Sequence, residues 1–155
     1  MVQSMPDCSP TKWHLAHTSW FFEQFLLAPR PGHRPYDERL NYLFNSYYQS
    51  VGAMHARPAR GLLTRPSLDE VRAYRAWVDE RVSRLLDDNA LDDSERAIVR
   101  LGTEHEQQHQ ELLLTDIKHA FSCNPLLPAY HAAPAPAPRP AVPLTFLGGA
   151  EGIVK

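Results

Sequence analysis

Apolar residues recur at helical spacing in three segments of the chain. The first segment begins at Ser9 and Pro10, which form an N-cap serine followed by a proline at the first helical position. It must end near Pro29, because proline cannot continue a helix. The residues that face one side of this segment are mostly aromatic: Trp13, Trp20, Phe21 and Phe25.

Two further helices are predicted in the second half of the chain. Ser67 and Glu70 match a capping box directly after Pro66, and an apolar stripe follows at helical spacing through Val71, Tyr74, Val78, Val82 and Leu85. The last helix is predicted to be capped by Asp93 or Ser94 and to continue to about Phe121. Residues 98–121 carry the apolar positions of this helix.

The segments between and after these helices have a different composition. Residues 28–65 form a long connection whose aromatic content, concentrated at 42–48, favours ordered packing over a solvated linker. Residues 125–143 hold half of the 14 prolines, which is typical of a semi-rigid linker. Residues 144–149 resemble a first strand and turn. The predicted division is therefore a helical domain at 1–124, a Pro/Ala-rich linker at 125–143, and the start of a further domain at 144–155.

The fold class predicted from these patterns is all-α. No strand pattern of any strength precedes residue 140, and three long amphipathic helices indicate an antiparallel bundle. Three such helices bury one another poorly, so a fourth is expected, and the chain supplies none. We therefore expect a chain that is truncated at both ends.

Composition excludes several classes of function. The 155 residues suffice for one ordinary domain, and 16 basic against 18 acidic residues give no basic stripe of the kind that binds nucleic acid. No apolar run of about 18 residues exists, so we expect no membrane span. The two cysteines make no disulfide framework, which favours a cytoplasmic location.

The eight histidines are the unusual feature of the composition. His105 and His109 are four residues apart, so they lie on one helix face and can share a metal ion. His17 is the best third ligand, because it lies among the aromatic residues of the first helix, and His14 is the reserve. The alternative is that these are core histidines with ordinary hydrogen-bond partners. The face of the last helix that carries the pair is predicted to point inward, together with Ile98, Leu101, Leu112 and Asp116.

The pair also matches the H-E-x-x-H pattern of zinc proteases, with Glu106 as general base. The extended form of that motif requires a glycine where this chain has Leu112 and a third histidine where it has Thr115. We therefore reject the protease interpretation.

Four stretches of the chain resemble the ergothioneine-biosynthesis sulfoxide synthases, in order and with matching spacing over residues 1–124. They are residues 9–23 (SPTKWHLAHTSWFFE), 44–48 (FNSYY), 57–67 (RPARGLLTRPS) and 102–111 (GTEHEQQHQE). Members of this family have an N-terminal DinB-like helical bundle and a C-terminal domain similar to the formylglycine-generating enzyme. They use non-haem iron(II) and O2 to join a thiol to the imidazole of hercynine, leaving a sulfoxide.

The resemblance implies specific roles for six residues. His17, His105 and His109 match the iron ligands, Gln108 matches a position that contacts hercynine, and Arg57 and Arg60 match a pair that holds the carboxylates of the thiol substrate. Two guanidinium groups are suited to grip carboxylates bidentately. The resemblance leaves open whether the thiol is cysteine or γ-glutamylcysteine, and whether the acceptor is hercynine or histidine, as in the ovothiol synthases.

The family's first bundle helix and its catalytic tyrosine have no counterpart in residues 1–155, so we expect this chain alone to lack full activity. Two other interpretations remain. One is a free-standing DinB-like thiol transferase that uses zinc or nickel. The other is a non-catalytic fragment that depends on a partner, for example as a homodimer through the exposed bundle face.

Overall fold

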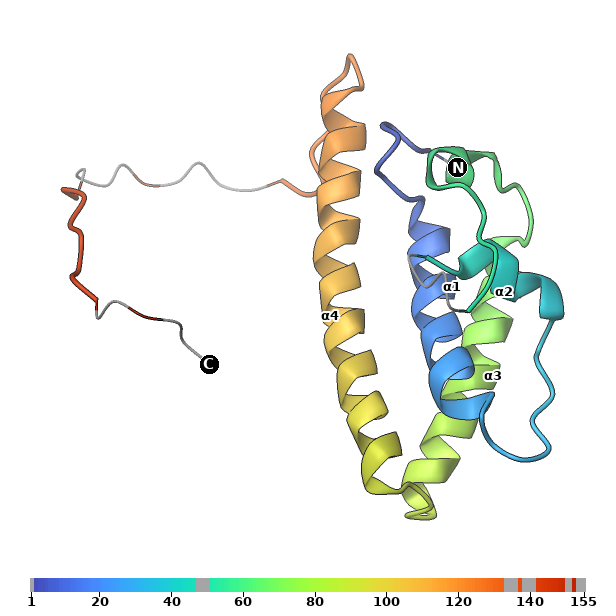
Figure 1. Ribbon diagram of the computed structural model, residues 1–155. Coiled ribbons are helices and arrows are strands. Elements are labelled where there is room, and N and C mark those ends of the chain that lie inside the picture. The colour runs from blue at the N-terminus through green and yellow to red at the C-terminus, as the bar shows by residue number, and fades with distance from the viewer. Residues whose placement is uncertain (1, 47–50, 133–136, 138–141, 150–151, 153–155) are drawn as a thin grey trace.

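The computed structural model describes residues 2–46, 51–132, 137, 142–149 and 152 (Figure 1). It is helical, and the described residues contain no strand. The described residues form four α-helices: α1 (Thr11–Phe22), α2 (Glu38–Phe44), α3 (Leu68–Asp87) and α4 (Asp93–Ser122). A π-helical turn at Glu23–Leu27 extends α1, and a 3-10 helix occupies Arg57–Leu62. None of the helices in the described part of the chain is long and apolar enough to cross a membrane.

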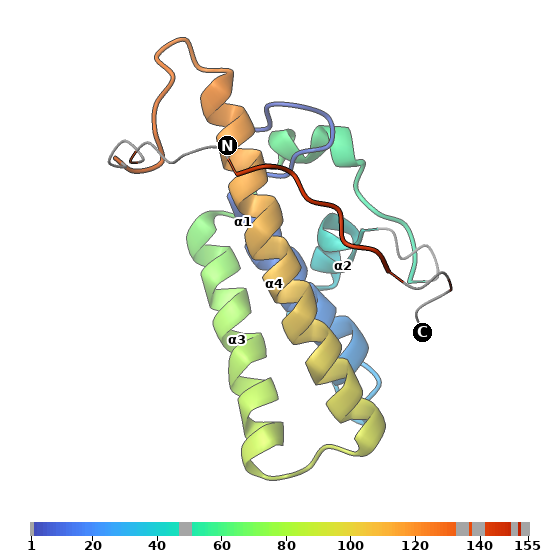
Figure 2. The same ribbon diagram turned by 90° about the vertical axis from the view of Figure 1, so that its left-hand side faces the viewer.

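Helix α1 lies between α3 and α4, and both pack on it (Figures 1 and 2). The prediction of an antiparallel bundle is correct for α4, which runs against the other two. It is wrong for α1 and α3, which run in the same direction (Figure 1). The reason is the long connection at residues 28–65, which returns the chain to the end at which α1 began.

The helix starts show which predicted caps form. The Ser67–Glu70 capping box of α3 is present as predicted. Helix α4 is capped one residue earlier than predicted, by Asp92, whose side chain accepts the Glu95 N–H at 2.8 Å in a second capping box.

The cap predicted at the start of α1 is absent. Ser9 does not cap this helix, because its hydroxyl accepts a hydrogen bond from Arg60 instead, and Pro10 takes the N-cap position.

The core is formed mainly by α1 and α3, with Leu27 of the π-helical turn and Leu40 and Phe44 of α2, while α4 contributes little to it. Eight of the 12 residues of α1 are buried. On α3, the predicted stripe is buried at Val71, Tyr74 and Val78. Only Gly102 and His109 are buried among the 30 residues of α4. Leu101, predicted to face inward, is 51% exposed, because among the described elements α4 packs mainly on α1 and the π-helical turn that extends it.

The connection at 28–65 is ordered in its described residues, as its aromatic content predicts. Helix α2 packs on α1, where the indole N–H of Trp20 donates to Asn41 at 2.7 Å. The indole N–H of Trp13 donates to the Leu43 carbonyl at 3.1 Å. Residues 47 and 48 of the aromatic stretch lie outside the described residues.

The strand predicted at the start of residues 144–149 is absent: residues 142–149 have no regular secondary structure. A strand needs a neighbour to satisfy its backbone N–H and C=O groups, and no strand is available in the described part of the chain. The described residues of the Pro-rich segment are exposed and non-helical from 125 onward. The domain boundary near 124 stays a prediction.

A buried carboxylate ties α1 to α3. Glu23 lies in the π-helical turn and accepts hydrogen bonds from the Tyr74 hydroxyl at 2.5 Å and the Tyr36 backbone N–H at 2.9 Å. Burial and the adjacent Glu23 raise the pKa of Tyr74, so its hydroxyl stays protonated and donates.

We predict that Tyr74→Phe lowers the free energy of unfolding by about 1.5–3 kcal/mol, because it removes a hydrogen bond to a buried charged group. Tyr36→Phe is the matched control, since Tyr36 contacts Glu23 only through its backbone N–H; a change within about 0.5 kcal/mol is expected there. Urea unfolding measures both. Equal losses in the two variants would contradict a specific role for the Tyr74 hydroxyl.

Candidate metal centre

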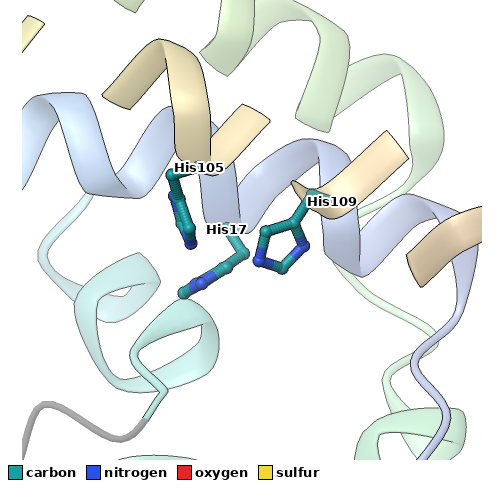
Figure 3. Close-up of side chains that lie close together, drawn as sticks. All are labelled: His17, His105 and His109. Carbon is teal, nitrogen blue, oxygen red and sulfur yellow. The ribbon is translucent and has the colours of Figure 1, made fainter. Parts of the chain in front are cut away.

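Three histidines from two helices converge at the contact between α1 and α4. His17 comes from α1, and His105 and His109 come from consecutive turns of α4 (Figure 3). One ring nitrogen of each histidine lies within 4.8 Å of the others. The prediction that these three residues meet is therefore confirmed, and the group could hold a metal ion.

The orientation of His17 is fixed on three sides. Its ring is stacked between Trp13, with centroids 4.5 Å apart, and Trp20, with centroids 5.5 Å apart. Its Nδ1 lies 2.6 Å from the Phe44 carbonyl oxygen at the end of α2, and a carbonyl can only accept. Nδ1 therefore carries the proton, which leaves a lone pair on Nε2, as a metal ligand requires.

The two histidines of α4 differ in their surroundings. His109 Nδ1 lies 2.8 Å from Nδ1 of His14, so the reserve ligand is bonded to a triad member instead of belonging to the triad. His105 Nδ1 is buried and has no hydrogen-bond partner among the described residues. No hydrogen bond at Nδ1 from a described residue therefore fixes the tautomer of His105.

All three rings are neutral at neutral pH. Burial lowers the pKa of His17 well below its usual range. Burial and the neighbouring His105 lower the pKa of His109 to about 3, and burial lowers the pKa of His105. Neutral imidazole is the form that binds metal ions, so the site needs no loss of ring protons before a cation enters.

The triad borders a cavity of about 180 Å³. Gln108, Arg57 and Arg60, which the sequence singled out as substrate-binding residues, line the same cavity. All six predicted site residues are thus brought together, although they come from three separate parts of the chain. Larger cavities of about 700 and 480 Å³ lie elsewhere, and no histidine lines either of them.

Arg60 is a buried cation beside the triad. Its two terminal nitrogens donate to the hydroxyls of Ser9 and Ser46, each at 2.9 Å, and its guanidinium carbon lies 3.5 Å from the ring centroid of Trp13. Burial and the nearby Arg57 lower the pKa of Arg60 to about 9, so it remains protonated at neutral pH.

Among the described residues, Arg60 forms no salt bridge, and its buried Nε has no hydrogen-bond acceptor. Arg57 is half-buried, and its Nε donates to the Asp7 carbonyl at 2.9 Å.

Glu106, the general base of the rejected protease interpretation, does not line this cavity. Its carboxylate lies 2.8 Å from the Arg75 guanidinium of α3, so its partner is structural. The sequence did not predict the hydrogen bonds that two neighbours of the triad make. His14 was expected only as a reserve ligand and Asp116 only as an inward-facing residue. Helical spacing could have indicated both positions, because His14 lies one turn before His17 and Asp116 lies two turns after His109.

A comparison with protein-family models and with curated proteins found no match to this chain. The description of the site therefore depends on its own geometry.

The lowered histidine pKa values predict how the stability of the metal-free protein depends on pH. Unfolded histidines titrate near pH 6.5, above the folded values, so the unfolded state binds more protons below that pH. The contribution of these histidines to the free energy of unfolding should be constant above about pH 6.5. It should fall below that pH by up to about 1.4 kcal/mol per pH unit for each buried histidine.

Urea unfolding at a series of pH values measures this slope. His109→Gln should reduce it by the share of one histidine, whereas His131→Gln, which changes an exposed side chain, should leave it unchanged. A slope that His109→Gln does not alter would contradict the burial of a neutral ring at that position.

Proposed function

We propose that this chain is the DinB-like, iron-binding domain of an ergothioneine-type sulfoxide synthase. The observation that carries the proposal is the single cavity lined by His17, His105 and His109 together with Gln108, Arg57 and Arg60. These are the six positions to which the sequence resemblance assigns iron, hercynine and thiol binding. A chance resemblance would not predict that six residues from three separate stretches line one cavity.

The donor set fits a non-haem iron(II) ion. Three neutral imidazoles on two helices would hold one side of the cation and leave other coordination positions for ligands. When bound, iron(II) would supply the activation of O2 and of the thiol in this family. Zinc or nickel would fit the same nitrogen ligands, and zinc binds such sites more tightly than iron.

The protein's own residues would bind and orient the two organic substrates. Gln108 has an amide that can both donate and accept hydrogen bonds at the rim of the cavity. The guanidinium groups of Arg57 and Arg60 would hold carboxylates of the thiol. The stacked ring of His17 and its bond to Phe44 keep this ligand still, which preorganises the site.

The charge of Arg60 favours an anionic ligand in particular. The buried Arg60 guanidinium has lost its hydration, and among the described residues Asp116 attracts it only at a distance, without a salt bridge. A substrate carboxylate in the adjoining cavity would supply a direct anionic partner. The cavity therefore favours a carboxylate-bearing substrate over a neutral or cationic one.

We predict that anaerobic titration with iron(II) gives one tightly bound equivalent, which is lost in His17→Ala and in His109→Ala. Each variant removes a ligand from a different helix, so a shared loss identifies a cross-helix site. His55→Ala is the matched control, because His55 bonds the Ala59 carbonyl and does not line the cavity.

Binding that survives His17→Ala would place the third ligand elsewhere. Absence of binding by a folded wild-type chain would contradict the iron proposal. Tight zinc or nickel binding, with thiol transfer that is indifferent to O2, would instead favour the thiol transferase.

We predict that Arg57→Ala weakens binding of γ-glutamylcysteine or cysteine to the metal-loaded protein by about 2 kcal/mol or more, while metal affinity is unchanged. Calorimetry with each thiol measures this loss. Arg34→Ala, at an exposed position outside the cavity, is the matched control. Equal thiol affinity in the wild type, Arg57→Ala and Arg34→Ala would contradict a role for Arg57 in carboxylate binding.

A further inference from the structure

A chain of hydrogen bonds runs from His109 to His14, which also lines the cavity, and on to Asp116. Nδ1 of His109 lies 2.8 Å from Nδ1 of His14, and Nε2 of His14 lies 3.1 Å from Oδ2 of Asp116. The backbone N–H of Ser9 donates to the same Asp116 oxygen at 2.8 Å. His14 is 4% exposed and the side chain of Asp116 is 14% exposed, so water competes little for these groups.

The direction of each bond follows from what the groups can donate. A carboxylate only accepts, so Nε2 of His14 carries a proton and donates to Asp116. In a neutral ring the other nitrogen, Nδ1, then has a lone pair and must accept. The proton shared between the two Nδ1 atoms therefore belongs to His109.

That assignment decides which nitrogen of His109 is available to a metal ion. With its proton on Nδ1, neutral His109 has its lone pair on Nε2. Figure 3 shows one ring nitrogen of His109 facing His17 and the other pointing away from the triad. Because Nδ1 is bonded to His14, the nitrogen that faces His17 is Nε2.

We propose that His14 and Asp116 are positioning residues that hold His109 in the tautomer and ring orientation that present Nε2 to a metal ion. This inference rests on the proposed metal site. His14 lies one turn before His17 on α1, and Asp116 lies two turns after His109 on α4. The pair thus couples the two helices that supply the ligands.

A role for His14 as a fourth ligand does not fit the geometry. Both of its ring nitrogens are already bonded, one to His109 and one to Asp116. Its ring is also not part of the group whose nitrogens converge. The arrangement is instead that of an outer hydrogen-bond partner, and removal of such partners weakens metal binding by about 10–100-fold.

The test uses the variants His14→Phe and Asp116→Asn. His14→Phe keeps a ring but removes the acceptor for the His109 proton. Asp116→Asn keeps the side-chain size but removes the charge that fixes the proton on His14. His119→Phe is the matched control, since this histidine of α4 is bonded to Ser4 and lies outside the triad. Thermal melting establishes that each variant is folded.

Two measurements are made at neutral pH. Long-range proton–nitrogen NMR spectra of the metal-free protein identify the tautomer of each histidine ring. Competition with a chelator measures the affinity for zinc(II), which is redox-inert and takes the same ligands.

We expect His109 to carry its proton on Nδ1 in the wild type and to lose that preference in His14→Phe. Zinc(II) affinity should fall by about 10–100-fold in His14→Phe. A smaller loss in the same direction is expected in Asp116→Asn.

A His109 tautomer that is unchanged in both folded variants would overturn the inference, as would unchanged zinc(II) affinity in both. If His14→Phe does not fold, Asp116→Asn decides by the same two measurements. A wild-type chain that binds no zinc(II) would remove the metal centre and the positioning role with it. The metal-free spectra distinguish that failure from a wrong assignment of the hydrogen bonds.

Discussion

The close approach of α4 to α1 is the contact on which the site depends. At Gly102 a side chain of any size would collide with the ring of Phe22, so the absence of one lets the two helices meet there. His105 follows three residues later and His109 one turn further on. Because α4 buries little else, the position of both ligands relative to His17 is set by this narrow contact.

Rigidity in the site comes mainly from α1 and its surroundings. His17 is stacked between two tryptophans of its own helix and bonded to the backbone of α2, so three groups from two helices fix one ring. Among the described residues, the rings of His105 and His109 make tilted or edge contacts instead of such stacking, and His109 is bonded to the side chain of His14. The two helices therefore contribute unequally: α1 supplies a held ligand, and α4 supplies ligands whose geometry depends on hydrogen-bonded neighbours.

Local patterns in the sequence predicted what depends on local interactions. The capping box at Ser67 and the meeting of His105 with His109 on one face follow from helical spacing alone. The role of Ser9 could not be predicted this way, since its hydroxyl is taken by Arg60, 51 residues later. The exposure of Leu101 and the parallel course of α1 and α3 likewise depend on which elements meet in space. Helical periodicity does not encode that information.

X-ray absorption at the iron edge of the anaerobic iron(II)-loaded protein counts the imidazole ligands of the metal centre directly. We expect a scattering pattern of three imidazole ligands that drops to two in His17→Ala. A spectrum dominated by oxygen ligands, or one that His17→Ala leaves unchanged, would contradict the assignment of a cross-helix histidine centre.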